Sequence, residues 1–189
     1  MSNRLITGSA VALLVLGVCL IVGSSLCLGA SLNFMLTPML NDLGISSEQA
    51  GTALALPAIG SLLIIFVTGR LGDRLGHRRI IMAASVFFVA GSALVALTQG
   101  TMLLNLGLLL AGASATAIQI VSLGLLQDQI PDGAPRVSAV TSFGMVFPAV
   151  YLVVPVLTGW VVGVASWRLI PLAWVLLGLL MPALALRLL

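Results

Sequence analysis

Charged residues are scarce in this sequence, and lysine is absent altogether. Only 7% of the 189 residues are charged, whereas an ordinary soluble domain has about 25%. So few charges cannot cover a water-facing surface, which excludes a soluble globular domain. Hydrophobic residues make up 60% of the chain. The solvent of this chain is therefore expected to be a lipid bilayer.

Metal ligands and catalytic groups are also scarce. His77 is the only histidine, and Cys19 and Cys27 lie eight residues apart on one apolar stretch. On a helix that spacing separates them by roughly 12 Å, which is too far for a disulfide. A membrane enzyme would need a nucleophile with a buried base or paired intramembrane aspartates, and neither pattern occurs. We expect no enzyme activity, no metal site and no cofactor.

The apolar residues form six long runs separated by short polar segments. Each run has about 17 to 27 residues, close to the roughly 20 that a helix needs to cross a bilayer. The runs do not alternate as the strands of a membrane barrel would, so helices are expected. The predicted fold is all-α, with residues 1–189 forming one six-helix transmembrane bundle. The predicted helices span residues 10–36, 51–69, 80–98, 102–126, 137–162 and 169–187.

The distribution of arginine predicts the orientation. When the loops are numbered alternately, seven arginines fall on one side and Arg168 alone falls on the other, with Asp42 and Glu48. Because basic loops stay in the cytoplasm, both termini are expected there. We therefore expect a multi-pass protein of a bacterial inner or plasma membrane, with the lipid bilayer and not nucleic acid as its partner. The first run is too long for a signal peptide, so the mature chain is expected to begin near Met1.

A weak internal repeat relates the first three runs to the last three. A shift of 90 residues aligns Asp42 with Asp132, Gly69 with Gly159, and Arg78 with Arg168. Three helices return the chain to the opposite face, so the second triplet would be inverted relative to the first. The pattern indicates an inverted 3+3 repeat, and coincidence is the alternative.

The most informative segment, residues 69–79, joins the second and third predicted helices and reads GRLGDRLGHRR. It resembles the loop signature of the major facilitator superfamily (MFS), G-x-x-x-D-R-x-G-x-R-R. The matching residues are Gly69, Asp73, Arg74, Gly76, Arg78 and Arg79. The resemblance implies that the Asp73 carboxylate pairs with nearby arginines and faces a helix N-terminus of an opposite half, as a conformational latch. A purely topogenic arginine loop is the alternative.

The glycines of this segment also have a physical meaning. Gly69 and Gly72 would let a neighbouring helix approach closely, and Gly76 would permit a tight reversal. Further resemblance lies in the turn at Trp167 and Arg168 and in the outer segment 42–46. Segment 154–159 matches the antiporter signature of helix five only in part, which argues against a proton-coupled drug antiporter.

The resemblance implies secondary transport of a small solute by alternating access, with this chain as the N-terminal six-helix half. Typical members have two such halves with substrate between them. The implied partners are a small-molecule substrate and a second six-helix half, which could be the same chain continued, a split partner or a homodimer. The alternatives are a non-transporting structural or regulatory membrane subunit, or a truncated fragment.

Uncharged polar residues are the candidates for a substrate cavity. No carboxylate lies within the six runs, so no proton carrier is expected at the membrane midplane. The cavity candidates are Asn33, Asn105, Thr116, Gln119 and Tyr151. Asn105, Thr116 and Gln119 share one helix face with Gly112. These amides and hydroxyls could instead join helices through hydrogen bonds, and Tyr151 could contact lipid.

Overall fold

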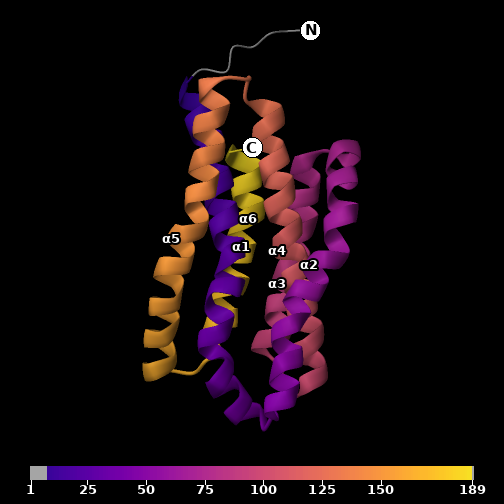
Figure 1. Ribbon diagram of the computed structural model, residues 1–189, viewed down its shortest axis with the longest axis vertical. Coiled ribbons are helices and arrows are strands. Elements are labelled where there is room, and N and C mark those ends of the chain that lie inside the picture. The colour runs from indigo at the N-terminus through magenta and orange to yellow at the C-terminus, as the bar shows by residue number, and fades with distance from the viewer. Residues whose placement is uncertain (1–7, 189) are drawn as a thin grey trace.

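The computed structural model describes residues 8–188, which form six helices and no strand (Figure 1). The helices are α1 (Gly8–Leu43), α2 (Ser47–Leu75), α3 (His77–Ala96), α4 (Thr101–Gln129), α5 (Ala134–Val164) and α6 (Leu169–Leu188). Even the shortest have 20 residues, or about 30 Å, which is the thickness of the hydrocarbon core. Each is long and apolar enough to cross a membrane. The predicted all-α, six-helix fold class is confirmed, and the chain is a multi-pass membrane protein.

Two segments predicted as loops are largely helical. α2 runs to Leu75 and α3 begins at His77, so the segment 69–79 contains only a one-residue break at Gly76. The φ of 88° at Gly76 gives the tight reversal expected of this glycine. At the opposite end, α1 continues to Leu43. Hydropathy shows where a helix leaves the hydrocarbon core of the bilayer, but the backbone hydrogen bonds of the helix continue beyond that point. The helices predicted from hydropathy are therefore too short.

The central helices of the bundle are α1 and α4. α4 packs mainly against α2 and α3, α1 packs mainly against α5 and α6, and α3 packs against α6. Exchanging helices one to three for helices four to six converts α2–α4 into α5–α1 and α3–α4 into α6–α1, and it leaves α3–α6 unchanged. The packing therefore has the symmetry of an inverted 3+3 repeat.

The connections alternate between the two ends of the bundle. In Figure 1 the start of α1, the end of α6 and the α2–α3 and α4–α5 connections lie at the upper end, which we call the arginine-rich end. The positions of the arginines along the helices place six of them at this end, namely Arg70, Arg74, Arg78, Arg79, Arg136 and Arg187. At the opposite end, Arg168 lies in the α5–α6 connection, Asp42 at the end of α1 and Glu48 in the first turn of α2.

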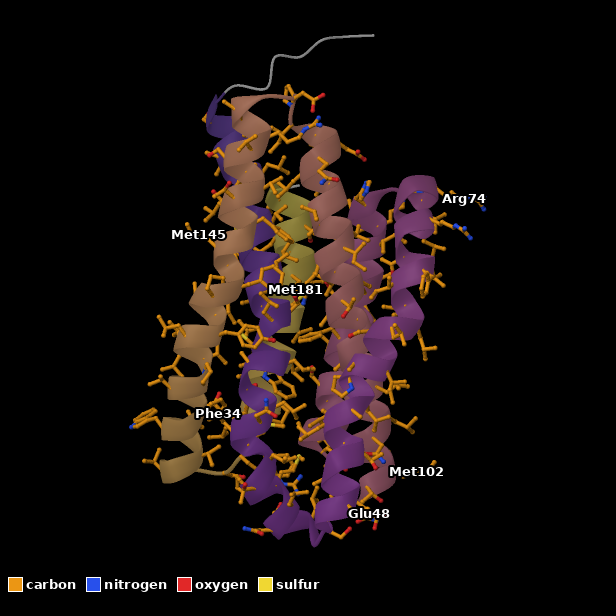
Figure 2. The ribbon with its side chains drawn as sticks, viewed as in Figure 1. Phe34, Glu48, Arg74, Met102, Met145 and Met181 are labelled. Carbon is orange, nitrogen blue, oxygen red and sulfur yellow. The ribbon has the colours of Figure 1, made fainter. Side chains whose placement is uncertain are left out.

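The helices with the least internal packing are α2 and α5. On α5 only Ala139, Phe143 and Thr158 are buried. Figure 2 shows Met145 of α5 projecting outward, whereas Met181 of α6 lies fully buried inside the bundle. So large an apolar surface must be covered by lipid or by an apolar partner.

Candidate functional site

A cavity of about 230 Å³ lies between α1, α2, α4 and α5. Glycine and proline allow this geometry, because α2 and α4 cross there in close contact. A Cβ added at Gly112 would lie 2.4 Å from the Cα of Pro57, so only glycine fits at the crossing. None of the lining residues carries a charge. They are Ser25, Leu26, Leu28, Gly29, Pro57, Ala58, Ser61, Gly112, Ala115, Thr116, Gln119, Phe147 and Tyr151.

Two hydroxyls in the cavity are bonded to each other across the α2–α4 crossing. The Thr116 hydroxyl donates to the Ser61 oxygen at 2.6 Å. The Ser61 hydroxyl in turn donates to the backbone carbonyl of Pro57 at 2.8 Å. Thr116 therefore does join two helices, as one of the two interpretations of the sequence held, while it also faces the cavity.

Gln119 has most of its hydrogen-bonding capacity free. Its side-chain nitrogen lies 3.5 Å from the Ser25 hydroxyl of α1, which is a long hydrogen bond. The amide has two N–H donors and an oxygen acceptor, and the oxygen has no protein partner within residues 8–188. Gln119 can therefore bind a polar group that enters the cavity.

The α5 side of the cavity is aromatic. Tyr151 is 50% exposed, and a Cβ added at Gly29 would lie 2.8 Å from its hydroxyl oxygen, so the phenol reaches α1 only because glycine is there. The ring of Phe147 contacts that of Phe143 with centroids 5.7 Å apart. This wall offers a flat apolar surface with one hydroxyl.

The structure brings three of the five predicted cavity residues together, namely Thr116, Gln119 and Tyr151. Asn33 and Asn105 do not line this cavity. Asn33 follows Gly29 by one helical turn and Asn105 precedes Gly112 by two, so both continue the lining faces toward the opposite end.

The sequence analysis missed two lining serines, Ser25 and Ser61. Ser61 follows Pro57 by one turn on α2, and that spacing could have placed it on the same face. Nothing in the sequence distinguishes Ser25 from its neighbour on α1.

Residues 69–79, which we call the latch segment after the role that the resemblance implies, lie at the arginine-rich end. Gly69 has no neighbour within 4 Å of an added Cβ among the described residues, so no helix of this part of the chain approaches it. The guanidinium of Arg78 donates to the carbonyl of Leu186 at 2.8 Å, which ties α3 to the end of α6. Arg74 and Arg79 are exposed and have no bonded partner in the described part. The predicted pairing of Asp73 lies outside the described residues, which do not include its side chain.

His77 fills a notch between α2 and α4 at the same end. Its ring is largely buried and touches both Gly72 and Gly124, and a Cβ added at Gly124 would lie 2.7 Å from Nε2. Its Nδ1 lies 3.5 Å from a carboxylate oxygen of Asp128. Gly124 thus allows the close approach of the ring, whereas a Cβ added at Gly72 would lie 3.6 Å from it, which is an ordinary contact. The sequence analysis assigned no structural role to this histidine.

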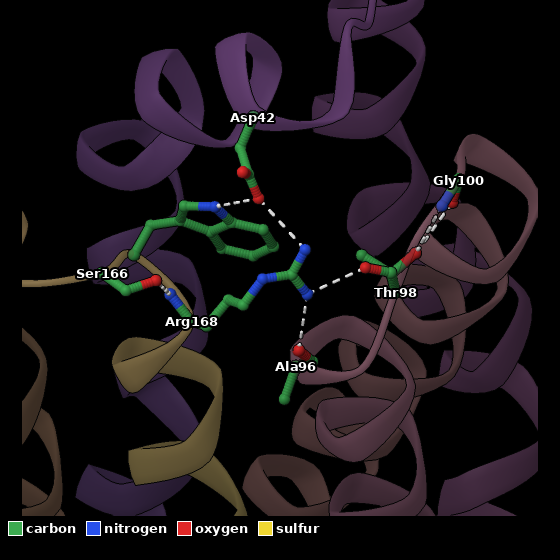
Figure 3. A network of polar contacts seen from close by, with 7 residues as sticks. Asp42, Ala96, Thr98, Gly100, Ser166 and Arg168 are labelled. Atoms are coloured by element: carbon green, nitrogen blue, oxygen red, sulfur yellow. Dashed lines mark hydrogen bonds and ion pairs between the residues drawn. The ribbon is translucent and has the colours of Figure 1, made fainter.

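At the opposite end, Arg168 connects three segments (Figure 3). Its guanidinium pairs with Asp42 at 3.0 Å and donates to the carbonyls of Ala96 and Thr98 at 3.0 and 2.8 Å. The Trp167 indole donates to the same Asp42 carboxylate at 3.1 Å. The end of α1, the α3–α4 connection and the α5–α6 turn are therefore joined by one polar network.

Comparison with known proteins agrees with the loop signature. The sequence profile of the Major Facilitator Superfamily matches residues 6–189. An uncharacterized MFS-type transporter of Mycobacterium tuberculosis is 32% identical over 128 residues, which cover 67% of this chain and 18% of that protein. The inner membrane transport protein YajR of Escherichia coli is 30% identical over 132 residues, covering 66% of this chain and 29% of YajR.

A multidrug resistance protein, MdtL of Klebsiella pneumoniae, is 28% identical over 91 residues, covering 48% of this chain and 23% of MdtL. The chain thus spans less than a third of the length of each of these relatives. The profile match, in contrast, covers almost all of this chain. The chain belongs to the major facilitator superfamily.

Proposed function

We propose that this bundle is one half of a secondary transporter that moves a small solute across the membrane by alternating access. The observation that carries the proposal is the uncharged polar cavity, which α1 and α4 line between the poorly covered helices α2 and α5. α2 and α5 make no substantial contact with each other, so no helix among residues 8–188 closes the gap between them. A cavity with one unclosed side suits a carrier in which a second unit completes the binding site.

The second unit is a further six-helix half that packs on α2 and α5. Both helices expose large apolar side chains, such as Phe66 at 76% and Leu152 at 73%. The length of the relatives leaves room for such a unit in the same chain, and a split partner or a homodimer would supply it equally well. Gly69, with no close neighbour among the described residues, leaves space for a helix of that unit beside the latch segment.

The substrate class follows from the lining of the cavity. An amide, several hydroxyls and two aromatic rings suit a neutral solute with both polar and apolar parts. The carboxylates Asp42, Glu48, Asp128 and Asp132 belong to the ends of the bundle, so the cavity itself supplies no proton carrier. We propose a carrier without a catalytic step, and coupling to an ion would depend on the second unit.

The proposed location is the bacterial inner or plasma membrane with both termini in the cytoplasm. The support is the clustering of arginines at one end of the bundle, because cytoplasmic loops retain basic residues. Among residues 8–188 the opposite end has Arg168 as its one arginine, and that residue is paired with Asp42.

Transport measurements on matched amide variants test the proposal. The membrane protein that contains this chain would be reconstituted in vesicles and screened with neutral amphipathic solutes. Gln119→Ala should reduce flux of the accepted solute several-fold, whereas Gln129→Ala, at the exposed end of the same helix, should leave it unchanged. If the wild type gave the same signal with and without every solute tested, or if both variants had equal flux, the result would favour a structural or regulatory subunit.

A further inference from the structure

A second hollow, which we call the α2–α3 groove, lies on the bundle away from the polar cavity. It has a volume of about 290 Å³ and shares no lining residue with that cavity. Its walls include Val67 and Leu71 of α2 and Phe87 of α3, and α4 forms its floor through small residues such as Ala113 and Ala117. α2 and α3 each pack far more closely on α4 than on one another, which leaves the space open between them.

The lining of the α2–α3 groove is almost entirely apolar. Its two polar lining residues are Thr68 and Ser114. The Thr68 hydroxyl donates to the Ile64 carbonyl at 2.8 Å, and the Ser114 hydroxyl donates to the Leu110 carbonyl at 2.6 Å. Both hydroxyls are therefore satisfied within their own helices, and no free polar group faces the groove.

The groove lies within one leaflet. Its α2 wall spans residues 64–71 and its α3 wall spans residues 80–87, each about 10 Å long at 1.5 Å per residue. A leaflet is about 15 Å deep, or half the hydrocarbon core. Leu71 lies in the last two turns of α2 and Ile80 in the first turn of α3, so the groove opens toward the arginine-rich end.

Two arginines stand at that opening. Arg74 follows Val67 by two helical turns and Arg79 precedes Ala83 by one turn, so both continue the outward-facing edges of the walls. Val67 and Ala83 are exposed, whereas Thr68 and Ala84, on the inner edges, are buried. Figure 2 shows Arg74 projecting away from the bundle at this end. Among the described side chains, which do not include that of Asp73, neither arginine has a bonded partner, unlike Arg78, which is bound to the Leu186 carbonyl.

We propose that the α2–α3 groove binds an anionic phospholipid, with an acyl chain in the groove and the phosphate between Arg74 and Arg79. An apolar slot of single-leaflet depth fits a hydrocarbon chain. Two exposed guanidinium groups above it fit a phosphate, which arginine binds through paired hydrogen bonds. A zwitterionic lipid carries a cationic group as well, which two arginines repel. The charge at the opening therefore selects an anionic headgroup.

Lipid titration of the purified membrane protein that contains this chain tests the proposal. Native mass spectrometry would compare phosphatidylglycerol with phosphatidylcholine of identical acyl chains. Each arginine should favour the anionic lipid by about five-fold. Arg74→Gln with Arg79→Gln should abolish the preference, and Arg187→Gln, which removes an exposed arginine at the same end on α6, should retain it. Ala83→Trp should fill the groove and lower the occupancy of both lipids.

Photolabelling locates the lipid independently. Phosphatidylglycerol with a diazirine in its acyl chain should label peptides of α2, α3 and α4 in vesicles, and Ala83→Trp should reduce this labelling. A wild-type preference in the double arginine variant, or an equal loss in Arg187→Gln, would overturn the proposal. The absence of label from the peptides that line the groove would also overturn it. That result is expected if the second six-helix unit covers the groove.

Discussion

Arg168 and Asp42, which are 126 residues apart in sequence, form an ion pair of 3.0 Å at the opposite end of the bundle. The same guanidinium holds the carbonyls of Ala96 and Thr98, which end α3 and begin the α3–α4 connection. One side chain thus joins both halves of the inverted repeat, because Asp42 lies at the end of α1 in the first triplet and Arg168 lies within the second triplet.

Arg168→Gln should destabilise the protein by about 1 kcal/mol, because the pair is partly exposed and its remaining partners regain water. For a chain of this size the apparent melting temperature should fall by about 2 to 4 °C. Circular dichroism of the purified protein in detergent would measure the change. Arg187→Gln, at an exposed position with no bonded partner among the described residues, is the control, and an equal fall in both variants would contradict the prediction.

Gly124→Ala should displace the ring of His77 from its notch, because the new Cβ would lie 2.7 Å from Nε2. We expect a loss of about 1 to 3 kcal/mol from the overpacked contact. In a double-mutant cycle with His77→Ala, removal of the ring should relieve most of this loss. The unfolding free energies of the four proteins would be compared. Strictly additive losses would mean that the ring does not occupy the notch.

Gly112→Ala should be among the most damaging single substitutions, because its Cβ would meet backbone and not a flexible side chain. The 2.4 Å approach to the Cα of Pro57 forces α2 away from α4 and breaks the hydrogen bond between Thr116 and Ser61. Gly51→Ala is the matched control, since its Cβ would meet no described atom within 4 Å. Expression and melting temperature should drop for Gly112→Ala alone, and similar behaviour of the two variants would argue against the close crossing.

The number and type of helices could be predicted because the bilayer imposes a strong length and composition requirement on each span. The reversal at Gly76 could be predicted because few residues adopt positive φ. The α4 lining face also followed from local information, since Gly112, Thr116 and Gln119 recur at helical spacing. Helix ends could not be placed, because helical hydrogen bonds continue into the interface where polarity rises.

The remaining features depend on how distant segments meet. Ser25 faces the cavity only because α1 is rotated toward α4, and hydropathy does not encode that rotation. The notch around His77 requires Gly124 of α4 to face the start of α3, which is distant in sequence. The network of Arg168 likewise joins three connections that are far apart in sequence.

The proposed orientation predicts side-specific chemistry at Arg74 and Glu48, which lie at the two ends of α2 and are both exposed. In a background without Cys19 and Cys27, Arg74→Cys should react with an impermeant thiol reagent only from the cytoplasmic side. Glu48→Cys should react only from outside. Labelling of intact cells and of inverted vesicles would measure both. Reaction of Arg74→Cys in intact cells would reverse the proposed topology.

The latch proposal predicts that Asp73→Asn impairs transport without impairing folding. Asp73 lies in the last turn of α2, near Gly69, where no described helix of this chain approaches. A helix end of the second unit could therefore come close to the carboxylate. Such an end carries roughly half a positive charge and contributes about 0.3 to 1 kcal/mol at an exposed site. An energy of that size shifts a two-state balance several-fold and is not needed for insertion.

Asp73→Asn should accordingly show near-normal expression, slower flux and a population shifted toward the inward-open state. Flux into vesicles would be measured with Gln119 intact. In a parallel set of proteins without Cys19 and Cys27, Gln119→Cys would report the reactivity of the cavity toward a reagent added from the cytoplasmic side. Asp132→Asn, which removes the carboxylate paired with Arg136 in the first turn region of α5, controls for loss of charge at the same end. Because the latch acts through a conformational balance, flux and reactivity should change together in Asp73→Asn and remain near wild type in the control. Unchanged flux and reactivity would leave the arginines of this segment with a topogenic role alone.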